Sequence, residues 1–201
     1  MTLRNWLRLR EYNPESAVCM TIGTDGFKVS RDHIMSLSVA SHRRTPSTVY
    51  LMGAKPEATQ EYTGVMPDYY ADKCVGTQRA EEILRTVVEA SEFVVTYSPT
   101  KFAVPWLEAQ APFMLSGVPI IDIAHIFKMF DAGEVYPLNV EELGELVSRL
   151  TTSLPGSDKG YSFTALCDRF LSEDKYSNML PLEAKIFQLW DLWLIALDKN
   201  V

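Results

Sequence analysis

The chain has 201 residues, of which 47% are apolar and 22% charged, proportions that are ordinary for a single globular domain. Lysine and arginine total 19 against 26 aspartates and glutamates, and the net charge of −7 argues against an overall basic surface that grips a long phosphate backbone, while a local basic groove stays open. The three cysteines are odd in number and lack Cys-x-x-Cys spacing, so we expect reduced thiols in a cytoplasmic protein. We also expect no signal peptide and no membrane span, because the N-terminus lacks an apolar core and no window is apolar over the length of a span.

Residues 1 to 14 form a short basic segment with an amphipathic pattern. Leu3, Trp6 and Leu7 recur at helical spacing. Such a segment can dock on a partner or an acidic surface, but chain ends that are tied down commonly pack across their own domain, and we predict the latter. We therefore divide the chain into an N-terminal amphipathic extension, residues 1–16, and one domain, residues 17–201.

Three short apolar segments follow, separated by turn-forming residues. The pattern from Ala17 to Gly26 indicates a buried strand that ends in a tight turn, and residues 33–41 and 47–52 predict two further strands. Their short connections favour an antiparallel meander. Alternate residues of a strand point to one face, so Thr21 and Gly23 are expected to share a face near the end of the first strand.

The rest of the chain alternates between helical and strand patterns and then continues with helices. Further strands are expected at residues 92–97 and 118–121. Helices are expected after Thr77 and at residues 99–110, 123–130, 143–150, 162–171 and 180–198. The whole predicts an α/β fold with a mixed five-stranded sheet, three antiparallel strands followed by parallel additions, flanked by helices.

Four short sequence segments occur in an order that points to a known family. They are EYTGVMPDY at 61–69, SPTKFAVPWL at 98–107, VPIID at 118–122 and YSFTALCDRF at 161–170. In this order they resemble the Thr-Gly-Ile, His-Asn-x-x-Phe-Asp, Asp-Thr and Ser-Leu-x-x-Leu segments of the DEDD-type 3′–5′ exonucleases, which include polymerase proofreading subunits. The resemblance runs from about Ala17 to Leu197 and implies a ribonuclease H-like fold.

The catalytic positions are where this chain departs from that family. The family holds two divalent ions with four carboxylates and uses a His or Tyr as base. The resemblance places the first carboxylate pair on Thr21 and Gly23, the next Asp on Ala103, and the final His and Asp on Leu180 and Lys185. No carboxylate stands at these positions, so the resemblance implies a catalytically inactive pseudoenzyme without a metal cofactor.

Three other acids leave an active enzyme open as an alternative. Asp25, Asp122 and Asp191 could supply a displaced ligand set for Mg²⁺ or Mn²⁺, and the chain would then be a metal-dependent 3′–5′ exonuclease. Plainer roles exist for two of them, because Asp25 suits a turn and Asp191 suits the solvated face of a helix. The three histidines lack companions at catalytic spacing, which argues against Ser-His-Asp chemistry.

The expected function is a binding or assembly module in a nucleic-acid-processing complex, in replication or repair, with a protein partner. Thr24, Lys101 and Lys185 are the candidates for contact with single-stranded nucleic acid. A structural or inhibitory protein without nucleic-acid contact is a further alternative, which the acidic net charge also fits.

Overall fold

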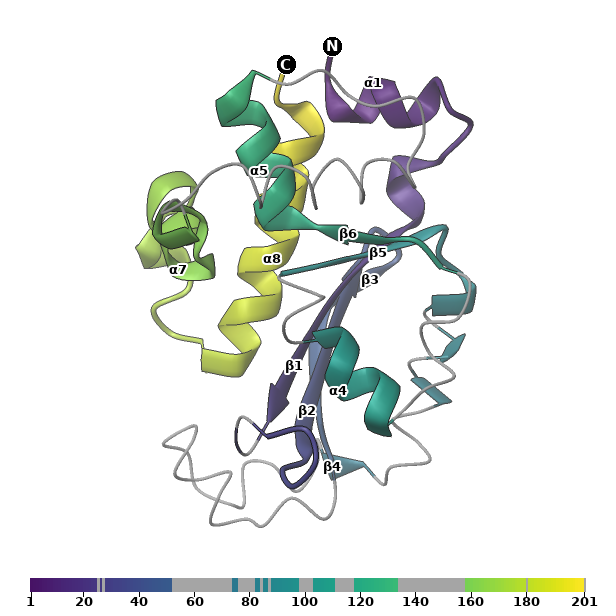
Figure 1. Ribbon diagram of the computed structural model, residues 1–201, viewed down its shortest axis with the longest axis vertical. Helices are drawn as coiled ribbons and strands as arrows, with labels where there is room; N and C mark the ends of the chain where they lie inside the picture. Colours follow the sequence, from purple (N-terminus) through teal and green to yellow (C-terminus); the bar gives the residue numbers. More distant parts are fainter. Residues whose placement is uncertain are drawn as a thin grey trace.

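The computed structural model describes residues 1–24, 26, 28–51, 74–75, 82–83, 85–86, 88–97, 103–110, 118–133, 158–179 and 181–200. Within these residues a single mixed sheet runs through the molecule, and helices cover both of its faces (Figure 1). Its strands are β1 (Ala17–Thr24), β2 (Ile34–Ser41), β3 (Arg44–Leu51), β4 (Cys74–Val75), β5 (Phe93–Thr96) and β6 (Ile120–Asp122).

The sheet has the spatial order β4-β3-β2-β1-β5-β6. Strands β1, β2 and β3 pair antiparallel, as the short connections predict, whereas β5 pairs parallel with β1 and β6 parallel with β5. The sheet has six strands rather than the predicted five, because β4 pairs parallel with β3. This strand lies between the strand predicted at 47–52 and the helix predicted after Thr77, where we predicted no strand, and its two residues are too few to show a period.

The described helices begin and end close to the predicted limits. They are α1 (Leu3–Arg8), α4 (Ala103–Gln110), α5 (Ile123–Ala132), α7 (Phe163–Phe170) and α8 (Pro181–Asp198), with the short 3₁₀ turns η1 (Pro14–Ser16), η4 (Asp158–Tyr161) and η5 (Glu173–Lys175). The helix expected at 143–150 lies outside the described residues, and so does much of the one expected after Thr77. In the described residues, no helix has both the length and the apolar content that a membrane crossing requires.

Side-chain caps explain where several helices start. The carboxylate of Asp122 accepts a hydrogen bond of 3.0 Å from the Ala124 amide, and the Ser162 hydroxyl accepts one of 3.1 Å from the Ala165 amide. Each cap satisfies an amide at a helix start that has no partner within the helix. Helix α5 ends at Gly133, whose φ of 65° is a left-handed conformation that glycine adopts without steric cost.

The sheet divides the core into two layers. The alternation of β1 sends Ala17 and Cys19 toward helices α1, α5, α7 and α8, and sends Val18 and Met20 toward helix α4 (Figure 1). Helix α8 packs along β1, β2 and β3. We call these two sides of the sheet the α8 side and the α4 side.

The N-terminal helix is part of the α8-side core. Leu3, Trp6 and Leu7 are fully buried in the same cluster as residues of α8. The two chain ends meet, since Thr2 forms a β-bridge with Asn200. This confirms the prediction that the basic amphipathic segment packs across its own domain.

Helices α5 and α7 are joined by an ion pair that links distant parts of the sequence. The Arg169 guanidinium donates two hydrogen bonds to the Asp131 carboxylate, at 2.6 and 3.0 Å, and the Tyr161 hydroxyl donates a third at 3.0 Å. The hydrogen bond from Arg169 lowers the pKa of Asp131, and the one from Tyr161 lowers it further, although burial opposes both. The pair fixes α7 against α5 and so positions one wall of the pocket described below.

Candidate functional site

Thr21 and Gly23 lie on the α8 side of strand β1. They follow Ala17 and Cys19 in the alternation of the strand, and these two residues belong to the α8-side core. Thr21 is half-buried and Gly23 is buried. The structure thus places this predicted pair on one face beneath the last helix, with one hydroxyl group and no carboxylate between them.

The neighbouring strand extends the same neutral surface. Thr21 pairs with Ser38 and Gly23 pairs with Ser36 across the antiparallel ladder. The two serines are only 2% and 1% exposed. This part of the sheet is therefore lined by small, uncharged side chains that are largely shielded from water.

Ala103 is not brought together with this pair. It is the first residue of α4, is 3% exposed, and packs in the α4-side core with Met20 and Ile22. A methyl group in an apolar layer can neither bind a cation nor reach the opposite side of the sheet. Lys101 and Leu180 lie outside the described residues.

Thr24 has a structural role that its sequence position does not reveal. The residue is 3% exposed, and its hydroxyl donates a hydrogen bond of 2.7 Å to the Gly26 carbonyl. The hydroxyl therefore stabilises the turn after β1 and does not face solvent, where a nucleic-acid phosphate would have to approach. Asp25 lies outside the described residues.

The two other acids proposed as displaced metal ligands are already engaged. Asp122 caps α5 and lies 3.3 Å from the Nδ1 atom of His125, with its side chain only 8% exposed. Asp191 on α8 accepts hydrogen bonds from the Tyr176 hydroxyl and the Lys175 ammonium group. Asp191 thus holds the η5 segment against α8, a role beyond the solvated helix face that the sequence suggests.

A two-metal site does not fit the residues that the structure describes. Among them, no group of three or more His, Cys, Asp or Glu side chains is placed to hold a metal ion. The predicted positions Thr21, Gly23 and Ala103 offer one hydroxyl oxygen in total, and Lys185 offers a cation. Divalent magnesium and manganese require several anionic oxygens, which this set does not supply.

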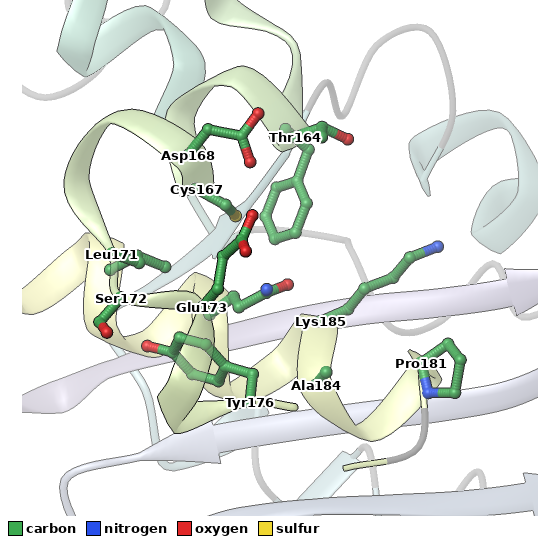
Figure 2. A pocket seen from close by; sticks show the side chains of 12 residues that line it. Thr164, Cys167, Asp168, Leu171, Ser172, Glu173, Tyr176, Pro181, Ala184 and Lys185 are labelled. Atoms are coloured by element: carbon green, nitrogen blue, oxygen red, sulfur yellow. The ribbon is translucent and has the colours of Figure 1, made fainter. Parts of the chain in front are cut away.

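Lys185 lies at the edge of a pocket of about 290 Å³ between α7, η5 and the first half of α8 (Figure 2). We call it the α7–α8 pocket. Its lining consists of Phe163, Thr164, Cys167, Asp168, Leu171, Ser172, Glu173, Tyr176, Pro181, Ala184, Lys185 and Gln188. Lys185 is exposed, and its ammonium group is free to meet a ligand that enters this pocket.

Sequence reasoning missed most of this pocket, because its lining comes from separate elements. Cys167 faces it, and burial, helped by the charge of Asp168, raises the pKa of the thiol to about 12. A thiol with so high a pKa is protonated at neutral pH and is a poor nucleophile. The arrangement therefore favours binding over covalent chemistry. The amphipathic patterns of α7 and α8 were the one signal in the sequence that could have located the α7–α8 pocket.

The sequence matches no protein-family model and no curated protein. Among solved structures, E. coli exonuclease I in complex with a dA16 oligonucleotide aligns over 89% of this chain and 40% of its own length, with a TM-score of 0.56 and 13% identity. Apo exonuclease I gives a TM-score of 0.52 at 13% identity, and the ExoI/SSB-Ct complex gives 0.53 at 12% identity. They align over 88% and 90% of this chain.

The chain thus spans about 40% of the length of these exonucleases. The mixed sheet and its flanking helices are consistent with the ribonuclease H-like architecture that the sequence resemblance implies. At this identity the likeness shows the fold alone, and the chain has an exonuclease-like fold.

Proposed function

We propose that this chain is a catalytically inactive exonuclease-like domain that serves as a binding or assembly module in a nucleic-acid-processing complex. The observation that carries the proposal is the α8 side of β1, where Thr21 and Gly23 stand at the positions that the resemblance assigns to a carboxylate pair. Magnesium gives up its water only to well-placed anionic oxygens, and two ions need several of them.

The remaining acids support the same proposal. Asp122 and Asp191 would each have to leave their present hydrogen bonds before they could bind a metal ion. Loss of catalysis leaves such a fold intact, because the residues that form the core are not the residues that bind the ions.

The partners are inferred from charge and from the structural neighbours. One exonuclease I structure contains a dA16 oligonucleotide and another is a complex with SSB-Ct, so both kinds of partner occur on this fold. In this chain the net charge of −7 favours a protein partner over extended contact with phosphates. Lys185 and Lys101 are the candidates for a local contact with a single strand.

A degradation assay tests the absence of catalysis. The purified chain is incubated with a 5′-labelled oligothymidylate and Mg²⁺ or Mn²⁺, with E. coli exonuclease I as the positive control. We expect no shortening from the 3′ end. Metal-dependent shortening that Asp191→Asn abolishes and Glu108→Gln retains would refute the proposal and establish displaced ligands. Glu108 is a suitable control because it is an exposed acid on α4, away from α8.

Fluorescence anisotropy with the same oligonucleotide tests nucleic-acid contact. If Lys185 touches phosphates, binding is salt-sensitive and is weakened by Lys185→Glu more than by Arg43→Glu. Arg43 provides the matched change, because it is an exposed cation in the turn between β2 and β3. Absence of binding by the unmodified chain assigns the module to protein assembly.

A further inference from the structure

The α7–α8 pocket has an apolar floor. Phe163, Cys167 and Leu171 contribute from α7 and its end, and Ala184 contributes from α8. These α7 positions are four residues apart, so they form one stripe along the helix. A pocket of about 290 Å³ lies at the small end of the range for ligand sites and suits one large side chain rather than an extended ligand.

The rim of the pocket is charged unequally. Figure 2 shows Asp168 and Glu173 on one side of the pocket and Lys185 on the other. Within the described part of the chain, these three side chains have no hydrogen bond or ion pair. By contrast, Asp131 and Asp191 on the same helical layer are both bound by cations. The rim therefore offers two available carboxylates against one ammonium group.

The walls of the pocket are held in place by contacts with neighbouring elements. The hydrogen bonds of Asp191 with Tyr176 and Lys175 join η5 to α8. The ring of Phe163 packs edge-on against Tyr97, with 5.5 Å between the ring centroids. A pocket formed by fixed walls can bind a partner without first ordering its own side chains, which lowers the entropic cost of association.

We propose that the α7–α8 pocket is a docking site for a short segment of a protein partner, which inserts one large apolar side chain and sets an adjacent Lys or Arg against Asp168 and Glu173. The proposal rests on the assembly role proposed above and names the surface that performs it. Charge complementarity favours a basic segment, since the rim and the whole chain are both acidic. Two unpaired carboxylates disfavour a phosphate-bearing strand at the same place.

The test is a nuclear magnetic resonance titration of the ¹⁵N-labelled full chain with two small probes. The probes are acetyl-Trp-Arg-amide and acetyl-Trp-Glu-amide, which differ only in the charged side chain. We expect the arginine probe to shift the amides of Thr164, Asp168 and Gln188, and the glutamate probe to bind at least about tenfold more weakly.

Two variants locate the effect. The double variant Asp168→Asn with Glu173→Gln is expected to weaken the arginine probe roughly tenfold, whereas Glu108→Gln leaves its affinity unchanged. Ala184→Trp, which fills the pocket, is expected to abolish the shifts while thermal unfolding stays cooperative. All the exchanged acids are exposed, so the charge variants should fold normally.

Three outcomes overturn the docking site. They are equal affinity for both probes, shifts that map outside the pocket, and no shift at the highest soluble probe concentration. An oligothymidylate that shifts the same amides would assign the pocket to nucleic acid instead. Nuclease activity would refute the proposed function but would leave the result of the probe titration unchanged. A chain without nuclease activity whose pocket binds neither probe would refute the docking site alone.

Discussion

Trp6→Ala tests whether the N-terminal helix is an essential part of the fold. Trp6 is fully buried in the α8-side core, and the Arg10 guanidinium lies 4.6 Å from its ring centroid. Truncation of a buried tryptophan costs about 3–5 kcal/mol, and loss of the cation–π contact adds about 0.5 kcal/mol. A domain is typically stable by about 5–15 kcal/mol, so this loss is a large fraction of the total.

Urea and thermal unfolding measure the effect. For a domain of this size, about 2–4 °C is lost per kcal/mol, so we expect the melting temperature to fall by roughly 6–20 °C. Leu9→Ala is the matched control, because Leu9 directly follows the same helix but is 71% exposed. Its expected change is within about 0.5 kcal/mol. A Trp6→Ala effect no larger than that of Leu9→Ala would refute the inclusion of this helix in the core.

Three further predictions concern the contacts of α7 and of the η5 segment. Arg169 lowers the pKa of Asp131 in the folded state, so the stability from this pair is present above about pH 4 and is lost as pH falls through the folded pKa. The urea unfolding midpoint of Asp131→Asn should therefore decrease less between neutral and acidic pH than that of the unmodified chain. Tyr176→Phe removes the hydroxyl that donates to Asp191, and it should cost about 1–2 kcal/mol in urea unfolding without creating or abolishing nuclease activity. Cys167, with a pKa of about 12, should react with iodoacetamide far more slowly in the folded chain than in urea, as mass spectrometry of its peptide would show.

Hydrophobic periodicity predicted the elements that bury a continuous face. The last helix was expected at 180–198 and is observed at Pro181–Asp198, with Trp193 fully buried and Trp190 packed against the same core. Strand β1 was equally predictable from the sequence, because its short apolar run ends in turn-forming residues. These patterns depend only on neighbours in sequence, and tertiary packing did not override them.

Interactions between distant residues were not predictable from these patterns. The Asp131–Arg169 pair joins residues 38 positions apart, and the bonds of Asp191 reach back 15 and 16 positions to Tyr176 and Lys175. The sequence contains many cations that could pair with Asp131 or Asp191, and only the packing of α5, α7 and α8 determines which of them does. The α7–α8 pocket was missed for the same reason, since no single segment contains its lining.

The packing on the α8 side of the sheet is compatible with the metal-free domain proposed above. Carboxylates at Thr21 and Gly23 would stand beside Ser36 and Ser38, which are nearly inaccessible to water, and without cations their charges would repel one another there. Small neutral side chains remove that cost and let α8 pack directly on β1, β2 and β3. The buried Ser36 hydroxyl carries a polar cost of about 1–3 kcal/mol, because it has no hydrogen-bond partner among the described residues. That cost is smaller than the burial of two unpaired carboxylates, so small neutral side chains at these two positions are consistent with the close packing of α8 on the sheet.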